Sequence, residues 1–373
     1  MMINPQMDKN HLIDNVESLL APAAVVDWRR MEPWTVARAE LSGLRGPVIV
    51  KWVRPHAAGS ARSESWRLRT EVAALRFLAD DLGLRLAPRV VAADLATCVV
   101  VLEDLGPRVA LDELLRTDGA AAHGDRLVSF ARVRGELNAA TAGRAEAYYG
   151  RRSALGAVDR VADCAGRFAG FREEGLRQAA ERGVALGDGA ERELAAVLAE
   201  LADPGPFLAL SNGDPEANNV LVRASGVPDA RLIDFEFAGF THALHDAVCL
   251  YVPGPGWLSV DAGLGEVYRE ALARGVAEAQ DDRRFGFGLA AACFSFVLVR
   301  LQRLAALDGR AAGDDSRVQL VATVEAAARV AESFGVLPGL AGWAWRVGAL
   351  LRRRWPDADV ELSVLPAYAA RRR

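Results

Sequence analysis

The segment SNGDPEANNV, residues 211–220, gathers three of the chain's seven asparagines around one aspartate, Asp214. The apolar run FLAL precedes it at 207–210, and RLIDFEF follows at 231–237. NVLVR, which begins at Asn219, and RLIDF are strand candidates joined by the turn sequence ASGVPDA. The sequence therefore predicts a polar loop next to a short hairpin, in a chain that is otherwise poor in amides.

The open end of this hairpin is expected to carry chemistry. Because the turn is centred near Val227, Asn219 and Asp234 are predicted to face each other to within one residue, and Asp214 enters the same end. Carboxylate and amide oxygens are hard ligands of the kind that Mg²⁺ takes. Asn219 and Asp234 are therefore the candidate metal ligands, which leaves Asp214 to accept a proton from a substrate hydroxyl. The alternative interpretation is an ordinary Asp-Pro turn capped by an asparagine.

Lysine is rare in this chain, since only Lys9 and Lys51 are lysines among its 45 basic residues. Lys51 lies within PVIVKWV at 47–53, an apolar run typical of a β-strand. Arginine and lysine are not interchangeable where a compact point charge must fit a narrow site. We therefore expect a functional role for Lys51. The alternative is that one of the two lysines lies in a strand by chance.

The composition is that of a soluble globular protein, with 51% hydrophobic and 25% charged residues in 373. The net charge of -4 argues against nucleic acid as a partner. The apolar run at 285–299 is too short to span a bilayer and predicts a buried core helix, so no membrane partner is expected. The four cysteines show no metal-binding spacing, which favours a reducing, cytoplasmic location. The oligomeric state is left open.

The pattern changes in the turn that follows Asp104. Residues 1–104 alternate short β-branched runs with one amphipathic helix over 63–81. Residues 105–373 are predicted to be almost entirely helical, including one long helix over 155–183. The hairpin that contains Asp234 is the exception. The sequence thus predicts an α+β protein with a small strand-rich domain before a larger helical one.

The motifs GDPEANN and LIDFE together resemble the catalytic signature of the aminoglycoside phosphotransferase and choline kinase-like families, which are relatives of protein kinases. The resemblance implies a protein-kinase-like fold of two lobes, with a β-rich N-lobe that binds ATP and a helical C-lobe. In that family the aspartate matching Asp214 is catalytic, and the residues matching Asn219 and Asp234 bind Mg²⁺.

The N-terminal residues agree with this resemblance. VIVKW is similar to the kinase strand whose lysine holds the α- and β-phosphates, which implies this role for Lys51. Glu71 then matches the helix glutamate that orients the lysine. VVVLEDLG resembles the last strand and hinge, so backbone groups near Glu103 and Leu105 are expected to contact the adenine.

Two departures from the family pattern leave alternatives open. Asn212 stands where the family has a histidine, and WRRMEPWTVARAEL contains no glycine-rich phosphate loop, so backbone amides near 31–35 are expected to cover the phosphates. The predicted reaction is transfer of the γ-phosphoryl group of ATP to a hydroxyl of an antibiotic or metabolite. One alternative is a kinase that phosphorylates Ser or Thr of a natural-product precursor peptide. Another is a nucleotide-binding pseudokinase that acts as a scaffold. The roles of Glu236, His242 and His245 are left open.

Overall fold

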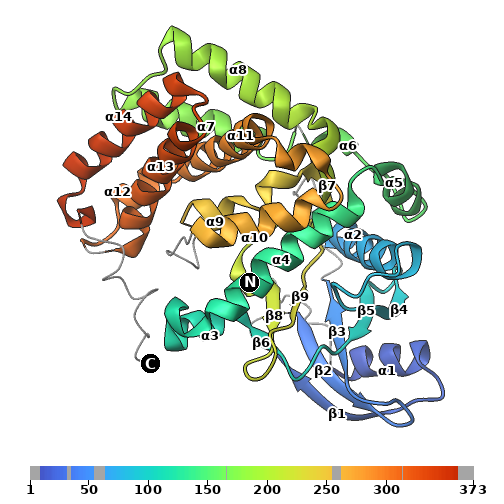
Figure 1. The fold of residues 1–373 in the computed structure, drawn as a ribbon. Helices are drawn as coiled ribbons and strands as arrows, with labels where there is room; N and C mark the ends of the chain where they lie inside the picture. Colours follow the sequence, from blue (N-terminus) through green and yellow to red (C-terminus); the bar gives the residue numbers. More distant parts are fainter. Residues whose placement is uncertain are drawn as a thin grey trace. The chain divides into compact units, whose positions relative to one another are not determined.

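The computed structural model describes residues 9–359 except 32–34, 54–63, 165, 254–261 and 313. Internal contacts divide the chain into two compact units (Figure 1). The first unit comprises Met1–Arg108, Glu146–Val158 and Arg231–Ala238, and the second comprises Val109–Ala145, Asp159–Ala230 and Gly239–Arg373. The segment that carries Asp234 thus belongs to the N-terminal unit, although it lies more than a hundred residues further along the chain.

A five-stranded antiparallel sheet in the order β1-β2-β3-β5-β4 forms the centre of the first unit. Its strands are β1 (Val25–Arg30), β2 (Val36–Leu41), β3 (Val48–Trp52), β4 (Val90–Asp94) and β5 (Val99–Glu103). The helices of this unit are α1 (Lys9–Leu19), α2 (Glu64–Arg76) with a π-helical extension (Phe77–Asp81), and α5 (Ala145–Ser153). The runs VIV and VVV favour strands because β-branched side chains suit a pleated, half-buried surface.

The two faces of β3 have different partners. Val50 and its neighbours two residues away are buried in a core with Leu12 and Val16 of α1. Successive side chains of a strand point to opposite faces of its sheet. Lys51 therefore points away from that core, and its register partners in the flanking strands are Val36 and Val100.

The second unit is mainly helical. Its helices are α3 (Leu111–Asp118), α4 (Gly124–Thr141), α6 (Arg160–Asp163), α7 (Ala169–Glu181), α8 (Asp188–Ala202), α9 (Val248–Tyr251), α10 (Ala262–Ala273), α11 (Asp282–Leu301), α12 (Leu304–Asp308), α13 (Asp315–Ser333) and α14 (Pro338–Arg354). Its short strands are β6 (Val109–Ala110), β7 (Leu208–Ser211), β8 (Val220–Val222) and β10 (Gly239–His242). A further strand, β9 (Ala230–Leu232), lies where the chain passes between the units.

Helix α11 is the core helix of the second unit. Its first turn is capped by Asp281, whose Oδ1 accepts from the N–H groups of Arg283 and Arg284 at 2.9 and 3.0 Å. It packs against α7 and α13 and buries Phe285 and Phe294 completely. Among the described residues it is the one helix long and apolar enough to cross a membrane, and 72% of its most apolar window is buried within the protein. The prediction of a buried core helix over 285–299 is confirmed.

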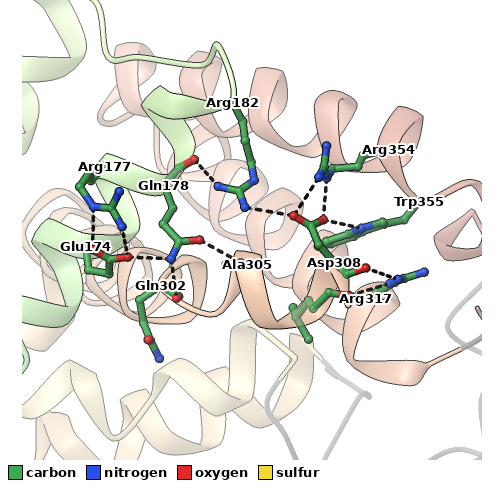
Figure 2. Close-up of polar contacts among 11 residues, drawn as sticks. Glu174, Arg177, Gln178, Arg182, Gln302, Ala305, Asp308, Arg317, Arg354 and Trp355 are labelled. Atoms are coloured by element: carbon green, nitrogen blue, oxygen red, sulfur yellow. Dashed lines mark hydrogen bonds and ion pairs between the residues drawn. The ribbon is translucent and has the colours of Figure 1, made fainter. Parts of the chain in front are cut away.

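The carboxylate of Asp308 accepts hydrogen bonds from several elements of the C-terminal part of the chain (Figure 2). Asp308, at the end of α12, accepts hydrogen bonds from Arg182 at 3.0 Å, from Arg354 at 2.6 and 2.9 Å, and from the Trp355 indole at 3.1 Å. Burial opposes ionisation, but these donors together lower the pKa of Asp308. One carboxylate thus ties the residues after α7 and the end of α14 to α12.

The predicted single helix over 155–183 is wrong. Over these residues the chain instead forms a loop that follows α5, the short helix α6, a second loop and then α7. Gly156 has φ of 145°, which a helix cannot contain, and Phe168 has φ of 63° immediately before α7. The apolar spacing across 155–183 comes from two separate helices, so the sequence pattern is continuous where the backbone is not.

Candidate functional site

Lys51 lies between two carboxylates in the first unit. Its Nζ donates to Glu71 Oε1 at 2.7 Å and to Asp234 Oδ1 at 2.9 Å. Burial by itself would lower the pKa of Lys51, but attraction to Glu71 and then to Asp234 outweighs burial and raises it. The side chain therefore remains a charged ammonium, and it is held by one residue of α2 and one residue of the segment after β9.

Glu71 is the more deeply buried of the two carboxylates. Its side chain is 3% exposed and that of Asp234 is 39% exposed. Glu71 Oε1 also accepts from the backbone N–H of Phe235 at 3.4 Å. Glu71 therefore fixes both the ammonium and the backbone next to Asp234.

Asp234 has an unusual backbone conformation. Its φ is 61°, in the left-handed region, where aspartate is tolerated better than most residues because of its short polar side chain. Lys51 contacts Oδ1, and Oδ2 has no partner among the described residues. A costly backbone conformation that points a half-exposed carboxylate away from a strand end is characteristic of functional sites.

The loop after β7 carries Asp214 and Asn219 in the second unit. Gly213, at φ 90°, allows the sharp turn after the strand. Asn219 Nδ2 donates to the backbone oxygen of Asp214 at 3.3 Å, and Asn219 Oδ1 accepts from Asn218 Nδ2 at 3.0 Å. The structure thus brings Asp214 and Asn219 together on one loop, as it brings Lys51 to Asp234 in the other unit.

Asp246 is a buried residue that contacts the start of this loop, and 1% of its surface is exposed. Its Oδ1 accepts from Ser211 Oγ at 2.5 Å, and Ser211 Oγ in turn accepts from the N–H of Gly213 at 2.9 Å. Burial raises the pKa of Asp246, and the strongest opposing effect is the charge of Arg134. Asp246 therefore supports the loop through Ser211.

Each of the two units carries a residue whose side-chain oxygen suits a divalent cation. Asp234 offers an uncommitted carboxylate oxygen, and Asn219 offers an amide oxygen, both of which are hard ligands. In the part of the chain that the structure describes, no three His, Cys, Asp or Glu side chains gather into a metal cluster. Mg²⁺ is commonly held by one or two protein ligands together with substrate phosphates and water, and each of these residues is a ligand of that kind.

The expected adenine contacts lie at the end of β5. The N–H of Glu103 donates to the oxygen of Arg89 at 2.9 Å, and the Leu105 oxygen accepts from Arg108 at 2.7 Å. Of the groups expected near adenine, these two already have partners in the chain, whereas the N–H of Leu105 has none among the described residues. Residues 32–34 of the expected phosphate-covering segment lie outside the described residues.

His242 is the last residue of β10 and is buried, whereas His245 lies three residues later and is partly buried. His242 Nδ1 accepts from the N–H of Leu244 at 3.2 Å, so His242 caps the short turn that follows it. Burial lowers the pKa of His245 to about 3, and its Nδ1 lies 3.2 Å from Thr241 Oγ1. Both histidines are therefore structural in their observed contacts.

Glu236 lies two residues after Asp234. Burial, followed by repulsion from Asp234, raises the pKa of Glu236 to about 7. Arg67 of α2 lies 3.6 Å from Glu236 Oε1 and covers the ring of Phe237 at 4.7 Å. Helix α2 thus contacts the segment after Asp234 through Arg67 as well as through Glu71.

Comparison with known proteins places these motifs in a family. The model of the phosphotransferase enzyme family matches residues 38–286, which is well over half of the chain. No curated protein sequence gives a significant match.

Three solved structures are similar in fold. The ethanolamine kinase of Plasmodium vivax has 9% identity and a TM-score of 0.52, over 80% of this chain and 85% of its own. The aminoglycoside phosphotransferase of Alicyclobacillus acidocaldarius has 15% identity and a TM-score of 0.50, over 89% and 96%. The macrolide 2′-phosphotransferase of Brachybacterium faecium has 16% identity and a TM-score of 0.50, over 84% and 97%. The expectation of a protein-kinase-like fold, with a small antiparallel sheet and a mainly helical remainder, is confirmed.

Proposed function

Because the chain belongs to the phosphotransferase enzyme family, we propose that it transfers the γ-phosphoryl group of ATP to a hydroxyl of a small molecule. The observation that carries this proposal is the position of Lys51, which contacts Glu71 at 2.7 Å and Asp234 at 2.9 Å. A lysine held between a helix carboxylate and a half-exposed aspartate is arranged to bind phosphate oxygens, since its charge is fixed in place before the ligand arrives.

In this proposal each side chain has one task. Lys51 binds the α- and β-phosphates and Glu71 orients it. Asp214 orients the acceptor hydroxyl and accepts its proton. Asn219 and Asp234 hold Mg²⁺, which when bound neutralises charge on the phosphates. The N–H of Leu105, at the end of β5, donates to the adenine.

The acceptor is proposed to be a small metabolite or an antibiotic. The structures of similar fold are named for ethanolamine, macrolide and aminoglycoside acceptors, which are small molecules. A precursor peptide is the second enzyme candidate, and it differs from the first in requiring an extended segment with Ser or Thr.

A phosphate transfer screen tests this function. The full chain is incubated with Mg·ATP and a panel of amino alcohols, aminoglycosides, macrolides and Ser/Thr peptides, and products are detected by the mass gain of one phosphate. We expect a phosphorylated small molecule and no phosphorylated peptide. Phosphorylation of a peptide alone would replace the small-molecule proposal with the peptide one. Nucleotide binding without transfer and without ATP hydrolysis would identify a pseudokinase.

A further inference from the structure

The loop that carries Asp214 rests on a completely buried arginine. Arg134 lies on α4 and has 0% of its surface exposed. Its Nη1 donates to Asn212 Oδ1 at 2.6 Å, and its Nη2 donates to the backbone oxygen of Asp214 at 3.3 Å. Two arms of one guanidinium thus contact the residue two positions before Asp214 and the backbone of Asp214 itself.

The positive charge of Arg134 has its compensating carboxyl group, Asp246, beyond direct contact distance. No carboxylate lies within 4.0 Å of this guanidinium in the described parts of the chain. A buried charge without compensation is costly, so a carboxylate at longer range must supply part of the balance. Asp246 does so, because Arg134 is the strongest of the groups that favour its ionised form. Of two consecutive residues, Ser211 therefore binds the carboxyl group of Asp246 and Asn212 binds the guanidinium of Arg134.

Helix α4 supplies a second anchor one turn from Arg134. Asn138 Nδ2 donates to Asp246 Oδ2 at 3.1 Å and to the oxygen of Leu210 at 3.0 Å. Residues four apart lie on the same face of a helix, so both side chains meet β7 and its loop. The Tyr268 hydroxyl, which donates to Asn138 Oδ1 at 2.7 Å, fixes the orientation of that amide.

The side chains of Arg134 and Asn212 are chemically matched. Guanidinium has only donors, so the residue opposite it must present an acceptor. The amide oxygen of Asn212 does this and accepts in addition from the N–H of Asp214 at 3.4 Å. In an imidazole at position 212, the ring nitrogen that faces the arginine would accept in only one of the two neutral tautomers, and a protonated ring would repel the arginine. Asn212, which stands where the family has a histidine, thus supplies the acceptor oxygen that the buried Arg134 requires.

We infer that Arg134 is a positioning residue for the reaction: through Asn212 and the Asp214 carbonyl it holds the Asp214 carboxylate in its working place. This inference rests on the proposed role of Asp214. It assigns Arg134 no contact with substrate, so its loss should lower turnover and leave ATP binding in the other unit unchanged. Displacement of a catalytic group by about 1 Å costs on the order of 10²-fold in rate.

Arg317 offers a matched control. It is also buried, at 8% exposure, and it donates to the backbone oxygens of Leu307 and Arg310 at 3.0 and 2.6 Å. Its other partners include Asp357 and the ring of Trp355, so its contacts lie around the end of α12 and after α14, and not at the loop of Asp214. Arg134→Lys and Arg317→Lys therefore make the same chemical change at two buried arginines of one unit. The positive charge is retained, and the planar guanidinium with its several N–H donors is lost.

The first measurement is steady-state release of phosphate from Mg·ATP by the full chain, with water or an identified alcohol as acceptor. We expect Arg134→Lys to lower kcat by about 10- to 100-fold while KM for ATP changes by less than about threefold. Arg317→Lys should leave both constants near wild type. In an Asn212→Leu background, Arg134→Lys should lower kcat only slightly further, because Arg134 is expected to act through Asn212. An unchanged kcat in Arg134→Lys would overturn the inference.

The second measurement does not need turnover. Amide hydrogen exchange of the peptide that spans residues 210–219 should be about tenfold faster in Arg134→Lys than in wild type, and unchanged in Arg317→Lys. Equal protection in the two variants would refute the inference even if the wild-type chain transferred no phosphate. Conversely, a wild-type chain without transfer or hydrolysis, but with the expected exchange difference, would refute the proposed function and leave the support of the loop by Arg134 established.

Discussion

Replacement of Glu71 with glutamine isolates the contribution of one charge to the position of Lys51. Glutamine keeps the shape of the side chain and an acceptor oxygen for the N–H of Phe235, and it loses only the negative charge. The Glu71 and Lys51 side chains are 3% and 21% exposed and their atoms are 2.7 Å apart, so water screens this pair weakly. A hydrogen bond between charged groups in such a place contributes about 1.5–3 kcal/mol. If about 2 kcal/mol of that energy positions Lys51, kcat/KM for ATP falls by about 30-fold in Glu71→Gln.

The assay is Mg·ATP turnover as a function of ATP concentration, with Glu40→Gln as the control. Glu40 makes the same type of ion pair in the same unit, but it lies 3.8 Å from Arg38 and the two side chains are 56% and 43% exposed. Exposed pairs contribute about 0–1 kcal/mol, so Glu40→Gln should stay within about fivefold of wild type. A Glu71→Gln enzyme as active as the Glu40→Gln enzyme would contradict the role of Glu71 in positioning Lys51. Thermal unfolding of both variants checks that the comparison is made between folded proteins.

Two predictions concern stability. Asp308→Asn should lower the free energy of unfolding at pH 7 by about 2–3 kcal/mol, because a carboxylate that accepts four hydrogen bonds loses its charge. Since the pKa of Asp308 is lowered by folding, this advantage of the wild type should shrink as the pH falls below about 4, and urea unfolding at pH 7 and pH 3 measures it. Gly175→Ala should cost more than about 2 kcal/mol, since a Cβ there would lie 1.9 Å from the Leu298 oxygen. Gly170→Ala, on the same helix with nothing within 4 Å, should instead stabilise by up to about 1 kcal/mol, and equal unfolding curves for the two glycine variants would contradict this packing.

The parts of the site that sequence reasoning selected have strong local signals. Lys51 stands in an alternating strand in a chain with one other lysine, and a strand alternates its faces by geometry alone. Asp214 and Asn219 lie in an amide cluster that composition makes conspicuous. The contact between Lys51 and Asp234 joins residues 183 positions apart, and it could be expected only from the family resemblance.

The parts that sequence reasoning missed depend on tertiary structure. Arg134 is one of 43 arginines, and its sole local signal is a polar pair with Asn138 at helical spacing. Burial turns that pair into a support for the loop, and burial cannot be read from an Ala- and Arg-rich helix. The left-handed backbone of Asp234 is likewise invisible in LIDFEF, because aspartate is compatible with ordinary strand geometry. Strand β10 was missed since its four residues, GFTH, are too few to show alternation.

The most direct test of the whole account compares nucleotide binding and turnover in Lys51→Met and Asp214→Ala. Calorimetric titration with Mg·ATP should show that Lys51→Met weakens binding by at least about tenfold, because phosphate oxygens lose their cation. Asp214→Ala should bind Mg·ATP like the wild type and lose turnover by about 10²- to 10⁴-fold. If Lys51→Met bound Mg·ATP with full affinity, or if Asp214→Ala turned over at the wild-type rate, the assignment of these residues to phosphoryl transfer would be contradicted.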